Sequence, residues 1–188
     1  MQVVQNTEEL IKAIESLKSE KLLGFDSEQK PTFKKNEKSH GIATIQLSST
    51  KECYIIQVKK IDNLSALFEL LESEDIPKVG INLAGDNHAL YSQFKIRMKA
   101  TIEIDSILSK LTSKDSIGAK KAAKIFLKKD LQKSKKMSTS NWENDILSDS
   151  QIKYAAEDAA VALDITIHLL NKYPFVIEAM PLWFKERV

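Results

Sequence analysis

The hydrophobic pattern changes its period several times along the chain, and each change predicts a new element. Asn6 and Thr7 suit a helix N-cap, and apolar residues then recur at helical spacing from Leu10 to Leu17. Three β-rich runs follow, and they cover residues 22–28, 42–47 and 54–58. Three strands in succession predict an antiparallel meander.

From residue 64 onward the pattern alternates between helices and strands. The predicted helices cover 64–71 and 85–94, and the predicted strands cover 78–81 and 101–105. Beyond Asp105 the pattern is helical only, from about Ile107 through a lysine-rich stretch and again from Ser150 to Leu170. A meander followed by alternating strands and helices predicts an α/β fold in which a mixed five-stranded sheet is flanked by helices.

Length and composition restrict the class of protein. With 188 residues, of which 43% are hydrophobic and 29% charged, we expect a single folded domain over residues 1–188. No stretch approaches the roughly twenty apolar residues of a membrane span, and no signal-peptide pattern opens the chain. We therefore expect a soluble intracellular protein without membrane contact, cytoplasmic or nuclear. Cys53 lies in an apolar run and is predicted to be a buried structural thiol.

Basic residues are concentrated in one segment. Between Lys110 and Lys136 there are ten lysines and only two acidic residues, an excess of +8, so the remainder carries −6 because the whole chain is +2. A concentrated basic segment suits a nucleic-acid backbone, whose phosphates bind through charge and counterion release. The alternative is an ordinary solvated helix face rich in lysine.

Two carboxylates end the first predicted strand. Asp26 and Glu28 are separated by one residue, and because strand side chains alternate, both project to the same side. Hard oxygen ligands of this kind suit Mg²⁺ or Mn²⁺. Taken alone, the pair is better explained as two solvated carboxylates at a strand end.

Two further elements carry acidic groups. Tyr154 and Asp158 lie four residues apart in a strongly helical stretch, so they share one face, and the small alanines around them allow that helix to approach the sheet closely. Asp86 falls near the first turn of the predicted helix 85–94. Each element alone has an ordinary explanation, as a core-edge tyrosine or as a carboxylate at a helix start.

In this order, the three elements resemble the Exo I, Exo II and Exo III motifs of the DEDD superfamily of 3′→5′ exonucleases, which have a ribonuclease H-like fold. The tyrosine four residues before the last aspartate is the mark of the DEDDy subgroup. From about Leu22 to Ile167 the chain looks like the exonuclease domain of the Werner syndrome protein and the catalytic domain of ribonuclease D. The segments that carry the resemblance include FDSEQKP, ATIQLSS, KVGINLAGD and STSNWENDILSDSQIKYAAEDAA.

The resemblance implies an enzyme that removes nucleoside 5′-monophosphates from the 3′ end of DNA by hydrolysis with two divalent ions, Mg²⁺ or Mn²⁺. It assigns Asp26 to bridge both ions, Glu28 and Asp158 to complete the site of the water-activating ion, and Asp86 to hold the second ion through water. Tyr154 is expected to orient the attacking water rather than to act as a base, since a phenol is mostly protonated at neutral pH.

Substrate contacts are predicted from position and charge. The candidates are Lys30, Asn82, the loop 34–40, and Lys120, Lys124 and Lys128, which recur every fourth residue along one row of a predicted helix. Trp142 has apolar neighbours, so we expect it to pack in the core rather than to stack on a base.

Other functions fit the same residues. An RNA 3′-trimming enzyme of the ribonuclease D type is the nearest alternative, although Tyr173 to Val188 is too short for the C-terminal helical domains of ribonuclease D, which favours DNA. A catalytically silent nucleic-acid-binding module and a phosphohydrolase of free nucleotides are the alternatives from other classes. The sequence leaves the sugar preference, the preferred end structure and the oligomeric state open.

Overall fold

The computed structural model describes residues 1–33, 38–112, 117–131 and 135–187, and residues 34–37 of the predicted substrate loop lie outside these ranges. The strands are β1 (Gln2–Val4), β2 (Leu23–Gln29), β3 (Ile42–Ser48), β4 (Cys53–Gln57), β5 (Lys78–Gly80) and β6 (Thr101–Glu103). The α-helices are α1 (Thr7–Leu17), α2 (Ser65–Glu72), α3 (Leu83–Phe94), α4 (Ile104–Thr112), α5 (Ala119–Ala122), α6 (Lys135–Ser138), α7 (Asp149–Lys172) and α8 (Leu182–Lys185). Short helical turns are η1 (Val58–Lys60), η2 (Ala123–Leu127) and η3 (Pro174–Ala179), of which η2 is π-helical.

The strands form one mixed sheet in the order β1-β4-β3-β2-β5-β6. The antiparallel meander β2-β3-β4 is confirmed, and β5, β6 and β1 join it in parallel. The predicted α/β class is confirmed, but the sheet has six strands rather than five. The missed strand, Gln2–Val4, is too short to show a period and is held at the edge by pairing with β4.

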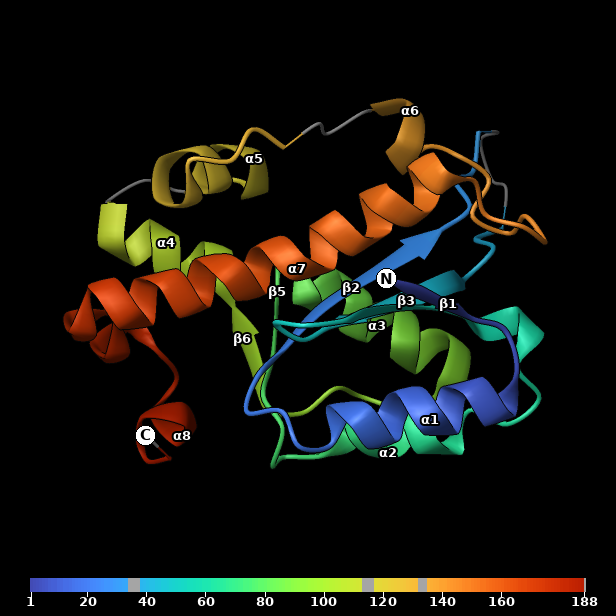
Figure 1. Ribbon diagram of the computed structural model, residues 1–188, viewed down its shortest axis with the longest axis horizontal. Helices are drawn as coiled ribbons and strands as arrows, with labels where there is room; N and C mark the ends of the chain where they lie inside the picture. The colour runs from blue at the N-terminus through green and yellow to red at the C-terminus, as the bar shows by residue number, and fades with distance from the viewer. Residues whose placement is uncertain (34–37, 113–116, 132–134, 188) are drawn as a thin grey trace.

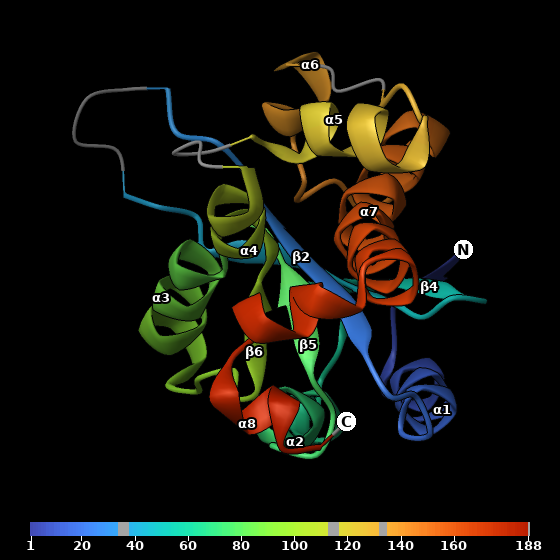
Figure 2. The same ribbon diagram turned by 90° about the vertical axis from the view of Figure 1, so that its left-hand side faces the viewer.

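Two different layers cover the sheet (Figure 1). On one face, apolar residues of the meander pack against α1, α2 and α3 in a continuous core. On the other face lies the long helix α7, which packs on two further hydrophobic clusters, one large and one small. Figure 2 shows α7 nearly end-on, with β2 beside it and α5 above it. Of the predicted site residues, Tyr154 and Asp158 lie on α7, whereas Asp86 lies on α3.

Side-chain caps explain where the two best-predicted helices begin. The Asn6 side chain accepts a hydrogen bond from the Glu9 backbone N–H at the start of α1. A capping box between Ser148 and Gln151 starts α7. One boundary differs from the prediction: β6 ends at Glu103 and α4 starts directly afterwards, because the isoleucines that read as strand also fit the buried face of a helix.

A close approach between α7 and β2 brings the two functional elements together. A methyl group added to Gly24 would clash with the backbone carbonyl of Ala159, so only a glycine fits between the strand and the helix here. Ala155 and Ala156 of α7 are also buried, which confirms that small residues let this helix approach the sheet. No helix within the described residues is long and apolar enough to cross a membrane.

Candidate active site

Three predicted carboxylates meet between β2 and α7. One oxygen from each of Asp26, Glu28 and Asp158 lies within 4.8 Å of the others, and all three side chains are half-buried. Asp26 and Glu28 project from the same side of β2, as strand alternation predicted, and Asp158 comes from α7. We call these three residues the acidic cluster.

The chemistry of the acidic cluster fits a divalent cation. Carboxylates this close repel one another when ionised, and a divalent cation offsets that repulsion. Three hard oxygen donors suit Mg²⁺ or Mn²⁺ better than the softer metals that prefer sulfur or imidazole. Among the described residues, this is the one group of three or more possible ligands that lie within reach of a single ion.

Tyr154 lies one helical turn before Asp158 and is half-buried, with its ring 6.1 Å from that of Trp142. The pKa of the Tyr154 phenol is raised well above its usual value. The main cause is burial, and the negative charges of Asp158 and Glu28 add to it. The phenol therefore stays protonated near neutral pH and can donate a hydrogen bond. This agrees with a positioning role and argues against its use as a base.

Asp86 lies outside the acidic cluster but is connected to it. Its carboxylate accepts a hydrogen bond from Ser27, the residue between Asp26 and Glu28. Burial raises the pKa of Asp86 to about 6. The start of α3 is fixed by Glu103, whose carboxylate accepts a hydrogen bond of 2.8 Å from the Leu83 backbone N–H. Ser27 and Glu103 were not singled out in the sequence: Ser27 lies inside the FDSEQKP motif and Glu103 in a predicted strand, but neither position reveals its contact with α3.

The lysine segment differs from the predicted row. Lys120, Lys124 and Lys128 do not lie on one regular helix, because α5 passes into the π-helical turn η2 after Ala122 and Lys128 adopts a left-handed conformation. All three side chains are exposed, so the segment remains a basic surface.

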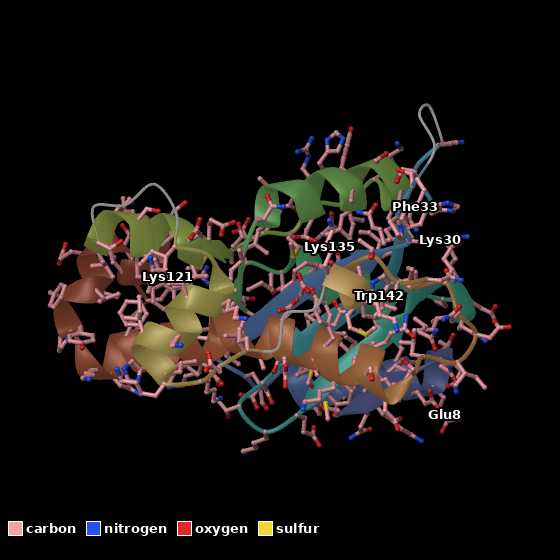
Figure 3. All side chains as sticks on the ribbon, turned by 90° about the horizontal axis from the view of Figure 1, so that it is seen from above. Glu8, Lys30, Phe33, Lys121, Lys135 and Trp142 are labelled. Carbon is pink, nitrogen blue, oxygen red and sulfur yellow. The ribbon has the colours of Figure 1, made fainter. Side chains whose placement is uncertain are left out.

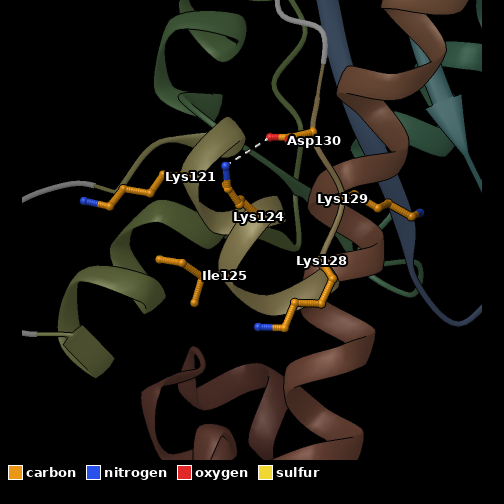
Figure 4. Close-up of a pocket in the computed structure, with 6 residues that line it drawn as sticks. All are labelled: Lys121, Lys124, Ile125, Lys128, Lys129 and Asp130. Carbon is orange, nitrogen blue, oxygen red and sulfur yellow. Dashed lines mark ion pairs between the residues drawn. The ribbon is translucent and has the colours of Figure 1, made fainter.

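The π-helical turn redistributes the lysines around a surface hollow of about 580 Å³ (Figure 4). Lys124 turns to Asp130, at 3.6 Å, while Lys121 and Lys128 lie on either side of the half-exposed Ile125. The prediction of a continuous row of three lysines is therefore wrong. The spacing of the lysines in the sequence does not reveal that η2 is π-helical and has a wider turn than an α-helix.

The remaining predicted residues are placed as follows. Trp142 is fully buried, which confirms the packing role, and Cys53 is buried, with the pKa of its thiol raised to about 11 by burial. Asn82 is exposed at the start of α3 in a left-handed conformation. Lys30 lies at the end of β2 and pairs with Glu143 at 3.4 Å. Glu143 was not singled out in the sequence.

A family model described as 3'-5' exonuclease matches residues 1–174. The chain belongs to the 3'-5' exonuclease family. This confirms the enzyme family, the hydrolase class and the fold that the three motifs implied. Enzymes of this family generally use divalent metal ions, and the acidic cluster fits such ions.

Individual relatives match this exonuclease chain over most of its length. The mouse bifunctional 3'-5' exonuclease/ATP-dependent helicase WRN is 32% identical over 153 residues, which are 80% of this chain and 11% of that protein. A 3'-5' exonuclease of Arabidopsis thaliana is 26% identical over 156 residues, covering 80% of this chain and 54% of that protein. The structure of Escherichia coli RNase D has a TM-score of 0.81 at 20% identity and covers 99% of this chain and 48% of that one. The chain thus spans about half or less of each.

Proposed function

We propose that this chain is a metal-dependent 3′→5′ exonuclease of the DEDDy type, and that its substrate is DNA. The observation that carries the proposal is the meeting of three carboxylates, from segments 130 residues apart, within 4.8 Å of one another. The family match supports the reaction class. We further propose that residues 1–188 act as a single exonuclease domain.

Each site residue has a role that follows from its place. Asp26, Glu28 and Asp158 would hold the divalent ions, and Asp86, which contacts Ser27, would contribute a fourth carboxylate. Bound there, two divalent ions lower the pKa of the attacking water and stabilise the charge on the phosphate and the leaving oxygen. Tyr154, kept protonated, donates a hydrogen bond that orients the attacking water.

DNA is proposed over RNA because of the sequence relatives. The motif segments resemble a Werner-type exonuclease, and identity to the mouse WRN protein is 32%. RNase D, described as an exoribonuclease involved in structured RNA processing, shares the fold at 20% identity, which supports the architecture only. RNA hydrolysis is therefore an outcome to be tested beside DNA hydrolysis.

The test is a time course on matched DNA and RNA oligonucleotides labelled at either end, single-stranded or with recessed 3′ ends. Reactions contain Mg²⁺, Mn²⁺ or EDTA, and the variants are Asp26→Ala, Tyr154→Phe and the exposed control Asp62→Ala. We expect stepwise shortening from the 3′ end of DNA that needs metal, disappears in Asp26→Ala and persists in Asp62→Ala. Faster shortening of RNA would overturn the substrate assignment, and binding without shortening would overturn the catalytic one.

A further inference from the structure

The segment that leads into α7 places one carboxylate among three basic side chains. The Glu143 oxygens lie 3.4 Å from Lys30 Nζ and 3.6 Å from His40 Nδ1, and one of them accepts a hydrogen bond from Lys59. The basic groups come from the end of β2, the loop before β3 and the turn η1. We call Lys30, His40, Lys59 and Glu143 the basic cluster.

The backbone around Glu143 is held in place by a buried neighbour and by hydrogen bonds. Trp142, the preceding residue, is fully buried. The carbonyl oxygens of Asn141 and Asn144 accept hydrogen bonds of 3.1 Å and 2.9 Å from the buried side chains of Gln151 and Gln57. Because this backbone is held on both sides, the position of Glu143 does not depend on a ligand.

The cluster carries more positive than negative charge. Two lysines face one carboxylate, so the net charge is +1 with neutral histidine and +2 with protonated histidine. The hydrogen bond from Lys59, with the other basic neighbours, holds the pKa of Glu143 below its usual range. The side chains of Lys30 and Lys59 remain 35% and 50% exposed, so both ammonium groups can reach a second anion.

The position of the cluster links it to the acidic cluster. Lys30 follows Glu28 by two residues, on the order of 7 Å along an extended chain. Phe33, whose side chain is 79% exposed, lies at the same end of β2 as Lys30 (Figure 3). Cationic groups beside an exposed aromatic ring are the combination that channels for single-stranded nucleic acid use to hold backbone and bases.

We propose that Lys30, Lys59 and His40 bind a phosphodiester group of the substrate strand away from the bond that is cut, and that Glu143 is an internal counter-charge which this phosphate displaces. The inference rests on the proposed function, because it assigns a substrate contact next to the same site. It goes beyond that function in two ways: it assigns the basic cluster as a contact for the nucleic-acid strand, and it assigns Glu143 as a residue that weakens substrate binding.

The test measures binding of a fluorescein-labelled ten-nucleotide oligothymidylate by fluorescence anisotropy in EDTA, over a range of salt concentrations. The variants are Lys30→Met, Lys59→Met and Glu143→Gln. The matched control is Lys51→Met, because Lys51 lies in the β3–β4 turn at the end of the sheet opposite Glu28. Thermal unfolding of every variant checks the fold, and Lys30→Arg checks that charge is what matters.

The lysine variants and the Glu143 variant are expected to change the binding affinity in opposite directions. Lys30→Met and Lys59→Met should each weaken binding about fivefold, and each should lower the slope of log K against log salt by about one. Lys30→Arg keeps the positive charge, so both the affinity and the slope should stay as in the wild type. Glu143→Gln should tighten binding about threefold, because the competing charge is gone and the amide keeps the same shape. Lys51→Met should stay within about twofold.

Two results would overturn the proposal. In the first, the lysine variants of the cluster behave as Lys51→Met does. In the second, Glu143→Gln weakens binding as the lysine variants do, which would make Glu143 a purely structural residue. Either result can occur while the wild-type protein still shortens oligonucleotides, so failure here is distinct from failure of the proposed exonuclease activity.

Discussion

The two faces of the central sheet use alternate residues of the same strands for different purposes. In β2, Leu23 and Phe25 are fully buried in the apolar core against α1, α2 and α3. The alternate residues Gly24, Asp26 and Glu28 face α7. Gly24 leaves room for the helix, and Asp26 and Glu28 belong to the acidic cluster. β3 repeats the division, since Ile45 and Leu47 belong to the apolar core and the buried Thr44 and Gln46 do not.

This difference separates stability from chemistry along a single strand. The apolar face contributes burial of hydrocarbon, which is the main favourable term in folding. On the α7 face, β2 contributes polar groups that are costly to hold close together and are retained where a ligand compensates them. Substitutions at neighbouring positions of β2 should therefore change different measured quantities. Three such changes follow, and a fourth prediction concerns Asp86 of α3, which contacts β2 through Ser27.

The largest effect is expected for activity in Asp26→Asn. The amide keeps the shape but loses a charge that would hold the divalent ions, so kcat/KM should fall on the order of 10³-fold. The free energy of unfolding in EDTA should not fall, because one of three mutually repelling carboxylates is neutralised. Steady-state kinetics and urea unfolding measure both, and activity within tenfold of wild type would contradict the role given to Asp26.

One position earlier, Phe25→Ala should act on stability. Removing a fully buried ring leaves a cavity in the apolar core, which costs about 3–5 kcal/mol of unfolding free energy. Urea unfolding measures it, with Phe33→Ala, 79% exposed, as the control that should change by less than about 0.5 kcal/mol. A loss below about 1 kcal/mol would show that the two faces do not differ as described.

Gly24→Ala should affect both quantities, because its added methyl meets the Ala159 carbonyl and forces α7 away from β2. We expect a loss of about 1–3 kcal/mol in unfolding free energy. A displacement of Asp158 by about 1 Å should lower kcat about 100-fold. Gly85→Ala is the stability control, since the added methyl there meets only the end of the flexible Asn82 side chain. An unchanged kcat in Gly24→Ala would show that catalysis does not depend on the close approach of α7 to β2.

The smallest effect is a pH dependence at Asp86. Because burial raises the pKa of Asp86 from 3.8 to about 6, the folded state binds this proton more tightly than the unfolded state does. The free energy of unfolding of the metal-free protein should therefore fall as pH rises from about 4 to 6, by on the order of 1–3 kcal/mol from this group. Urea unfolding in EDTA tests this: Asp86→Asn should show a shallower pH dependence, and identical curves would refute it.

Much of the framework was predictable because it depends on local geometry. Alternation along a strand places Asp26 and Glu28 on one side, and helical periodicity places Tyr154 and Asp158 on one face. The capping residues of α1 and α7 are likewise local signals. The edge strand β1 was missed because three residues show no period, and its pairing partner lies about fifty residues away.

The amino-acid sequence by itself therefore determined the period of each element, the side on which the predicted acids project and, through its motifs, the family. Tertiary structure decided which distant groups meet: Glu143 with Lys30, Ser27 with Asp86, and Asp158 with the end of β2. The physical reason is that the backbone fixes geometry over a few residues only. Contacts between segments tens of residues apart depend on how closely the layers pack, as Gly24 allows beneath Ala159.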